Sequence, residues 1–278
     1  RLQNAVTSLS KQEYPADQAE IIVVDDASDT PINKSKLQQL AKPFQLILIR
    51  NNENQGRAMA RNTGLKLSKG QVILFLDSDM TVENSFFRAH ASYHSKYENA
   101  VCIGNIMWGT EITKNALTRY SENRGVHRKG AKAKIDFKCF VTGNSSVSKE
   151  LLDKSGRFDE DFRMYGGEDL ELGVRLKANG SQFFYASEAI SYHHHVRPLN
   201  QLCSLMQTYG FYSMPILIKK QPNLKAVLRL NFLEKSLFSP QRLLWKIMLR
   251  PIVYWPIHWI TRKGMAWRLP NIFFDYIL

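Results

Sequence analysis

The feature that most constrains the fold is an apolar run, residues 71–80 (QVILFLDSDM), which ends in two carboxylates. Val72 to Leu76 are apolar without alternation, and such a run predicts a strand buried on both faces of a sheet. Asp77 and Asp79 follow directly, and burying carboxylates costs desolvation free energy unless a positive group offsets their charge. The run therefore predicts a buried sheet whose strand delivers paired carboxylates to a cation.

Other apolar runs alternate with helical patterns over the first 200 residues. Strands are expected within 19–29, 44–51, 71–76 and 100–107, and helices within 56–70, 83–97 and 166–180. A strand, a turn and a short helix are expected over 140–162, strand–turn–strand over 181–195, and a flexible loop over 108–140. This order predicts an α/β fold with a mixed, mainly parallel sheet flanked by helices.

The first segment, residues 1–15, has the pattern of an amphipathic helix that ends at Pro15, with Leu2, Val6 and Leu9 on one face. A doubly wound sheet normally opens with a strand, and here the helix comes first. We therefore expect the first strand of the sheet to lie upstream of residue 1. The alternative is a fold that begins with a helix.

Charge divides the chain in two. The net charge is +13, and residues 201–278 hold 11 Lys and Arg against only Glu234 and Asp275, which gives +9. We expect a catalytic domain over 1–200 and a basic, aromatic-rich helical extension over 201–278. The three cysteines form no metal-binding or disulfide pattern, which favours a reducing compartment.

Three acidic groups stand where the chain reverses after a strand or enters a helix. They are Asp25 with Asp26, Asp77 with Asp79, and Glu168 with Asp169. Ligands of open α/β sheets bind outside the carboxyl ends of the strands, and clustered carboxylate oxygens suit Mg²⁺ or Mn²⁺ shared with substrate phosphates. One such group alone is typical of an acidic turn or a helix cap, whereas three together favour a metal-assisted site.

Five motifs occur together in this order: EIIVVDDASD, NQGRAMARNTGL, ILFLDSDM, GNSSVSKELLDKSGRFDEDF and GGEDLELGVRL. In order and spacing they resemble family 2 glycosyltransferases of the GT-A fold, over roughly residues 1–196. The resemblance implies transfer of a sugar from a nucleotide-activated donor, a UDP-sugar, with inversion and a divalent cation. The acceptor would be a hydroxyl of a glycan, a polysaccharide or a lipid-linked glycan.

The resemblance also implies roles for the donor side of the site. Asp26 would hydrogen-bond the nucleotide base, with Asp25 and Ser28 shaping that pocket. Asp77 would lie near the ribose, and Asp79, as the last residue of the DxD motif, would bind the metal that holds the diphosphate. Gly56 would allow a close backbone approach, while Arg61 would meet the nucleotide, cap its helix or brace the loop.

On the acceptor side, Asp169 matches the family's catalytic base. An inverting transfer needs an ionised carboxylate within reach of the acceptor hydroxyl, and a helix N-terminus favours that charge. Glu168 would orient the acceptor or brace the loop, and Asn144 resembles a position beside the acceptor. His193, at the end of the last strand, would supply a further metal ligand.

The basic tail, residues 242–278, interleaves Trp245, Trp255, Trp259 and Trp267 with Lys and Arg, and Pro251 and Pro256 break any long helix. The pattern favours a segment that lies on an anionic membrane surface without spanning it. Packing onto the catalytic domain or a second subunit is the alternative. No nucleic-acid-binding motif is present, so a nucleic-acid partner is not expected.

These observations predict a glycosyltransferase in the cytoplasm, peripheral to the inner face of the membrane. Two other functions remain open from the sequence. A sugar-phosphate nucleotidyltransferase has a related fold but carries a glycine-rich basic loop after its first strand, a region outside this sequence. A catalytically degenerate sugar-binding or scaffold protein is the second, although Asp26, Asp79 and Asp169 are all present.

Overall fold

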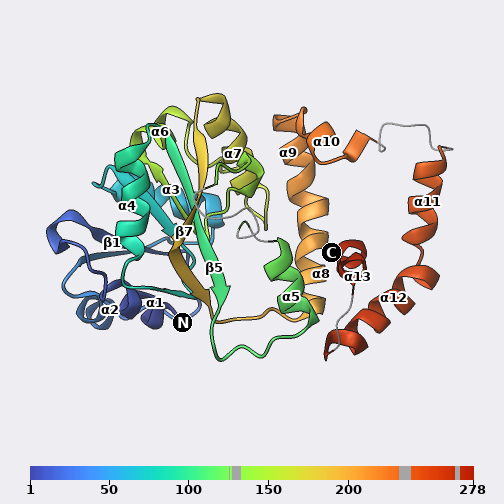
Figure 1. The fold of residues 1–278 in the computed structure, drawn as a ribbon, viewed down its shortest axis with the longest axis horizontal. Coiled ribbons are helices and arrows are strands. Elements are labelled where there is room, and N and C mark those ends of the chain that lie inside the picture. The colour runs from blue at the N-terminus through green and yellow to red at the C-terminus, as the bar shows by residue number, and fades with distance from the viewer. Residues whose placement is uncertain (125, 127–132, 232–238, 267–269) are drawn as a thin grey trace. The chain divides into compact units, whose positions relative to one another are not determined.

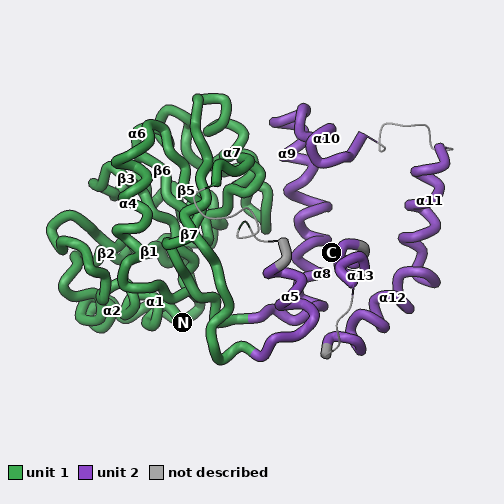
Figure 2. Tube along the Cα trace, in the orientation of Figure 1, with its two compact units in different colours: residues 1–112, 125–195 green, residues 113–124, 196–278 purple. Residues whose placement is uncertain are grey.

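The computed structural model describes residues 1–124, 126, 133–231, 239–266 and 270–278. The chain forms two compact units, coloured separately in Figure 2. Unit 1 comprises residues 1–112 and 125–195, and unit 2 comprises residues 113–124 and 196–278. Residues 113–124 thus group with the C-terminal helices. Residues 125 and 127–132 of the loop expected over 108–140 lie outside the described residues.

Unit 1 alternates strands and helices, as the sequence predicts (Figure 1). Its strands are β1 (Glu20–Asp25), β2 (Gln45–Arg50), β3 (Val72–Leu76), β4 (Met80–Val82), β5 (Ala100–Trp108), β6 (Asn144–Ser148) and β7 (Gln182–His193). Its helices are α1 (Leu2–Leu9), α2 (Lys34–Ala41), α3 (Arg57–Leu67), α4 (Phe86–Lys96), α6 (Lys149–Lys154) and α7 (Glu168–Ala178), with 3-10 turns η1 (Ala16–Gln18) and η3 (Phe137–Cys139).

The strands form a parallel pair, β1–β2, and a mixed five-stranded sheet in the order β3-β6-β5-β7-β4. The longest pairings are parallel: six residue pairs join β1 to β2 and nine join β5 to β7. The β3–β6, β5–β6 and β4–β7 pairings are antiparallel. The expected mixed sheet with flanking helices is confirmed.

Helix α4 covers one part of the five-stranded sheet and contacts β3, β5, β6 and β7. Phe86 and Tyr93, seven residues apart and so on the same face of the helix, are buried against Cys102 of β5 and Phe184 of β7. A second cluster joins Val6 of α1 to the β1–β2 pair, with Leu2 and Leu9 packed against it. The predicted apolar face of the first helix is confirmed.

Two local predictions in unit 1 are corrected by the structure. Helix α1 ends at Leu9, not at Pro15, and the side chain of Gln12 instead donates to the backbone oxygen of Glu83. The expected turn within 181–195 is a bulge in one continuous strand, because Gly104 pairs with Ala186 and the next residue, Asn105, pairs with Ile190.

The loop expected over 108–140 is wrong in part, because a helix forms at 116–124. This helix, α5 (Ala116–Arg124), belongs to unit 2. The side chain of Asn115 accepts hydrogen bonds from the backbone N–H groups of Leu117 and Thr118, which satisfies two donors at the helix start. Leu117 and Tyr120, one turn apart, are buried.

Unit 2 is helical. Besides α5 it contains α8 (Leu199–Thr208), the π-helical turn η4 (Tyr209–Ser213), α9 (Met214–Lys220), α10 (Leu224–Val227), α11 (Pro240–Met248), α12 (Pro251–Lys263), the 3-10 turn η6 (Gly264–Ala266) and α13 (Asn271–Ile277). Its core joins Leu117, Leu199, Cys203 and Phe274. Among the described residues, no helix has the length and apolar character needed to cross a bilayer.

Candidate active site

The predicted acidic groups stand at the ends of strands and at a helix start in unit 1. Asp25 is the last residue of β1, Asp77 follows β3 immediately, and Glu168 begins α7. The apolar runs before Asp25 and Asp77 are the strands that the sequence predicts, and the chain must leave the sheet where each run stops. The placement that the pattern indicates is therefore confirmed for these three segments.

Asp25 is a buried structural residue. Its carboxylate forms an ion pair with Arg50, the last residue of β2, and accepts a hydrogen bond of 2.9 Å from the backbone N–H of Ser28. Arg50 also donates to the backbone oxygen of Ser28 at 2.7 Å. Burial raises the pKa of Asp25, but the hydrogen bonds and the charge of Arg50 outweigh it and hold the pKa below the ordinary value. Asp25 thus ties the ends of β1 and β2 together.

Asp26 organises the segment between β2 and α3. Its carboxylate accepts hydrogen bonds from the side chain of Asn51 at 2.7 Å and from the backbone N–H groups of Gln55 and Gly56, the latter at 2.8 Å. Gly56 has φ +88°, and a Cβ there would stand 2.6 Å from the backbone oxygen of Arg163. Only glycine fits, and the close approach predicted at this position is to protein backbone.

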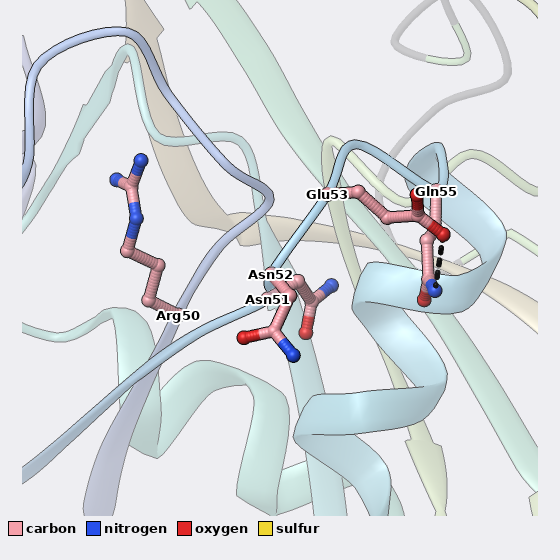
Figure 3. A pocket seen from close by; sticks show the side chains of 5 residues that line it. All are labelled: Arg50, Asn51, Asn52, Glu53 and Gln55. Atoms are coloured by element: carbon pink, nitrogen blue, oxygen red, sulfur yellow. Dashed lines mark hydrogen bonds between the residues drawn. The ribbon is translucent and has the colours of Figure 1, made fainter.

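A pocket of about 510 Å³ opens beside this segment (Figure 3). Its lining is wholly polar: Arg50, Asn51, Asn52, Glu53 and Gln55. Two of these residues, Asn51 and Gln55, donate hydrogen bonds to Asp26. Asp26 therefore fixes the shape of a polar pocket at the carboxyl end of β2, where α/β sheets bind ligands.

Asp77 lies against the segment before β6. Its backbone N–H donates to the backbone oxygen of Gly143 at 3.1 Å, and a Cβ on Gly143 would stand 3.2 Å from Asp77 Oδ2. The absence of a side chain at residue 143 leaves room for this carboxylate. Asp79, two residues on, has its Oδ1 3.7 Å from Nε2 of His193, the last residue of β7. The predicted approach of His193 to Asp79 is therefore found.

The fit of a divalent cation can be tested on these groups. Asp77 and Asp79 supply hard oxygen donors, which suit Mg²⁺ or Mn²⁺. His193 fits less well, since its Nδ1 lies 3.2 Å from the backbone N–H of His195 and accepts from it. Because Nδ1 accepts a hydrogen bond, a neutral imidazole carries its proton on Nε2, the nitrogen that faces Asp79. A metal-bound histidine instead binds the metal through its unprotonated nitrogen and donates the N–H of the other nitrogen.

Within the described parts of the chain, no group of three or more His, Cys, Asp or Glu side chains could hold a metal ion. The carboxylates fit a cation that takes its remaining ligands from a bound diphosphate and water, which is the usual arrangement for Mg²⁺. His193 Nε2 lies 3.7 Å from Asp79 Oδ1, beyond hydrogen-bond distance, and in this tautomer it presents a proton rather than a lone pair, so it does not fit as a ligand in this geometry.

Asp169, at the start of α7, is held by Thr142. Its carboxylate accepts from the backbone N–H of Thr142 at 3.1 Å and from the Thr142 hydroxyl at 3.0 Å. Burial raises the pKa of Asp169 to about 6, with the charge of Glu168 adding to the rise, while Arg61 and Thr142 oppose it. The carboxyl is therefore ionised at neutral pH and is still basic enough to accept a proton.

Arg61 joins the two acids of the GGED motif. Its guanidinium donates to Glu168 Oε1 at 2.9 Å and lies 3.5 Å from Asp169 Oδ1. The same group stacks over the ring of Phe158, 5.4 Å from its centroid. Among the described residues Glu168 Oε2 is buried without a hydrogen-bond partner. Arg61 thus braces Glu168 and Asp169, in line with one of its predicted roles, and its contact with a nucleotide stays a prediction.

The contacts of Asn144 favour a structural role over the predicted position beside the acceptor. The residue is fully buried. Its Oδ1 lies 2.9 Å from His90 Nε2, and its amide nitrogen donates to the backbone oxygen of Ala189 and the hydroxyl of Ser191, both at 2.9 Å. The hydrogen bonds of this side chain are all made to protein groups of α4 and β7. Asn144 braces β6 against α4 and β7.

Two residues next to Asn144 were missed. Thr142 holds Asp169, and Gly143 makes room for Asp77. The TGN sequence carried a signal, because a threonine and a glycine before a buried strand are frequent at functional turns. Consecutive residues thus link the DxD segment to the acid at the start of α7.

Acidic segments stand at the ends of β1 and β3 and at the start of α7, and a polar pocket lies at the end of β2, as expected of an α/β protein that binds polar ligands. Comparison with known families makes the class specific. The model described as glycosyl transferase family 2 matches residues 1–156, and that described as N-terminal domain of galactosyltransferase matches residues 124–198. The first match covers more than half of the chain. The chain belongs to glycosyl transferase family 2.

Curated relatives agree with this assignment. The chain is 26% identical over 249 residues to an uncharacterized glycosyltransferase, YfnE, of Bacillus subtilis, covering 69% of this chain and 61% of that protein. It is 29% identical over 215 residues to the hyaluronan synthase of Pasteurella multocida, covering 66% of this chain and 22% of the synthase. The chain therefore spans less than two thirds of the length of these relatives.

Solved structures share the fold. Staphylococcus aureus TarS 1–349 in complex with UDP-GlcNAc matches with a TM-score of 0.60 at 15% identity, covering all of this chain and 78% of that chain. GalNAc-T7 with UDP, GalNAc and Mn²⁺ matches with a TM-score of 0.55 at 18% identity, covering 80% of this chain and 48% of that one. The predicted GT-A fold is confirmed.

Proposed function

We propose that this glycosyltransferase moves a sugar from a UDP-sugar to a hydroxyl group of a glycan or lipid-linked acceptor, with inversion at the anomeric carbon. The observation that carries the proposal is the state of Asp169, a carboxylate oriented by Thr142 with a pKa raised to about 6. A general base works best when its pKa lies near the operating pH. The nucleotide sugars named for the structural neighbours support the choice of donor.

In the transfer, the acceptor oxygen forms a bond to the anomeric carbon as the bond from that carbon to the diphosphate breaks. The electron pair of the broken bond leaves with the diphosphate. The acceptor's proton passes to a carboxylate oxygen of Asp169. Thr142 holds that carboxylate through two hydrogen bonds, so it need not reorient when the acceptor attacks.

The donor side is built from the other two acidic segments. The polar pocket that Asp26 shapes would take the nucleoside, and the carboxylates of Asp77 and Asp79 would hold Mn²⁺ or Mg²⁺ together with the diphosphate. When bound, the cation would stabilise the negative charge that develops on the leaving nucleoside diphosphate. Asp25 supports this side from within the sheet through its ion pair with Arg50.

A nucleotide-release assay tests the proposal. The purified chain is incubated with a panel of UDP-, GDP- and other nucleotide sugars, with Mn²⁺ or Mg²⁺ and simple glycan acceptors. We expect UDP release from at least one UDP-sugar, together with a glycosylated product whose new anomeric centre is inverted. A chain that binds UDP-sugars but releases no nucleotide with any acceptor would instead be a sugar-binding relative.

A further inference from the structure

Helix α11 in unit 2 carries an exposed apolar face. Its apolar side chains Leu243, Leu244 and Ile247 are all exposed, and no residue of the helix is buried. Residues separated by three or four positions lie on one side of a helix, so these three form a single stripe. Lys246, three residues after Leu243, is exposed at the edge of this stripe. The helix is therefore amphipathic with its apolar side towards solvent.

Helix α12 repeats the arrangement on its outer face. Its inner face packs within unit 2, where Ile257 joins the core cluster and Thr261 is fully buried. The opposite face carries Ile252, Trp255 and Trp259, at spacings of three and four residues, and these side chains are 81%, 61% and 61% exposed. Exposing two tryptophans and an isoleucine on one helix face is costly unless that face meets an apolar partner.

The charge around these helices has one sign. Between Glu234 and Asp275 the sequence contains no acidic residue. Lys246, Arg250, Arg262 and Lys263 are exposed on or beside α11 and α12. A partner for this surface must therefore accept tryptophan and aliphatic side chains and also carry negative charge.

We propose that α11 and α12 bind the surface of an anionic lipid bilayer. Tryptophan favours the boundary between headgroups and acyl chains, aliphatic side chains enter just below it, and lysine and arginine meet the lipid phosphates. None of the described helices could cross the bilayer, so the contact is interfacial. The inference concerns unit 2 alone and does not depend on the sugar that unit 1 transfers.

Two other partners fit less well. A symmetric pairing of this surface with a second copy of the chain would bring its cations face to face, which opposes association. A nucleic acid would satisfy the cations, but its phosphate backbone would leave Ile252, Trp255 and Trp259 in water. Of these three partners, the lipid surface is the one that satisfies both the apolar and the charged side chains.

Vesicle sedimentation with the full chain tests the proposal. Binding is measured to vesicles of phosphatidylcholine and to vesicles of equal parts phosphatidylcholine and phosphatidylglycerol. We expect binding to the anionic vesicles, weakened by salt, and much weaker binding to the neutral ones. Trp255→Ser with Trp259→Ser should reduce binding about tenfold or more, since the buried apolar area is lost. Phe211→Ser, which removes an exposed aromatic of unit 2 outside α11 and α12, should leave it unchanged.

The charge is tested separately. Replacing Lys246, Arg250, Arg262 and Lys263 by Gln should weaken binding to anionic vesicles by about fivefold for each basic residue. Replacing four exposed lysines of unit 1 by Gln is the control, at Lys34, Lys36, Lys69 and Lys154. Circular dichroism checks that each variant folds.

The proposal is overturned if the chain stays in the supernatant with both kinds of vesicle. It is also overturned if the tryptophan variant binds as well as the unaltered chain. Should the unaltered chain be a dimer that the tryptophan variant converts to a monomer, without vesicle binding in either, the surface is an interface between copies. Size-exclusion chromatography of the same samples gives that result.

Discussion

Thr142 places two hydrogen bonds on the carboxylate of Asp169, one from its backbone N–H at 3.1 Å and one from its hydroxyl at 3.0 Å. The next residue, Gly143, accepts a hydrogen bond from the backbone of Asp77. The proposed base and a proposed donor-side residue are thus held by two consecutive residues. Mutations in this segment should affect catalysis before they affect folding.

Thr142→Val tests the hydroxyl, because valine has almost the same shape and cannot donate. A hydrogen bond to a charged group contributes about 1.5–3 kcal/mol, so kcat/KM should fall by about tenfold to a hundredfold. The loss also removes an interaction that lowers the pKa of Asp169, so the acid limb of the pH profile should move to higher pH. Thr142→Ser should restore activity. Equal profiles for the valine variant and the unaltered chain would exclude the role.

Arg61→Gln tests the charge beside the base. The guanidinium lowers the pKa of Asp169, so its removal should raise that pKa further above about 6. Since the base must be ionised, kcat/KM should drop in mild acid and recover as the pH rises. The pH dependence of kcat/KM measures this shift, with Arg88→Gln, at an exposed arginine, as the control. A lower kcat/KM with no change in the pH profile would make Arg61 purely structural.

Asp79 and His193 should differ in their effects on metal dependence. If Asp79 is a ligand and His193 only lies near it, Asp79→Asn should strongly raise the Mn²⁺ concentration for half-maximal activity. His193→Gln keeps an N–H donor and should change it little. A Mn²⁺ titration of nucleotide release compares the two. A larger effect from the histidine variant would show that His193 rotates to ligate the cation.

Asp25→Asn should destabilise unit 1 without acting on the chemistry. Arg50 would lose its buried carboxylate partner, which should cost about 1–3 kcal/mol of unfolding free energy at neutral pH. The folded pKa of Asp25 lies below the unfolded value of about 3.9, so the contribution is present above that pH and is lost as the pH falls through the folded pKa. In urea unfolding, Asp25→Asn should have a lower unfolding free energy than the unaltered chain at neutral pH, and the same unfolding free energy at acid pH. The control Glu13→Gln should not differ from the unaltered chain at either pH.

The sequence alone was sufficient to predict those features of the fold and the site that depend on a local pattern of residues. The continuous apolar run at Val72–Leu76 identified a strand, and the acids that end it had to lie at the edge of the sheet. The GGED motif placed Asp169 at a helix start. These inferences needed only the chain's local order.

The features that the sequence did not predict depend on contacts between segments that are distant in the chain. Thr142 meets Asp169 across 27 residues, and Asn144 meets His90 across 54, so neither partner could be read from spacing. The bulge at Ala186–Ile190 looks like a turn in the sequence. It is recognised as part of one strand only because β5 pairs with the residues on both sides of it. Helix α5 was missed because Leu117 and Tyr120 find their core in distant helices of unit 2.

Asp169→Asn is the most direct test of the proposed base. We expect kcat to fall by about a hundredfold to ten-thousandfold. The folded state raises the pKa of Asp169 to about 6 from an unfolded value of about 3.9, so the ionised carboxyl costs stability as the pH rises through this range. The variant should therefore be more stable than the unaltered chain at neutral pH, by about 1–3 kcal/mol.

The measurement is the single-turnover rate of sugar transfer by Asp169→Asn, alongside urea unfolding of the same sample and with Asp17→Asn as an exposed control. Lost transfer in a protein that is at least as stable as the unaltered chain agrees with Asp169 as the base. Transfer at the unaltered rate by the folded variant would contradict it.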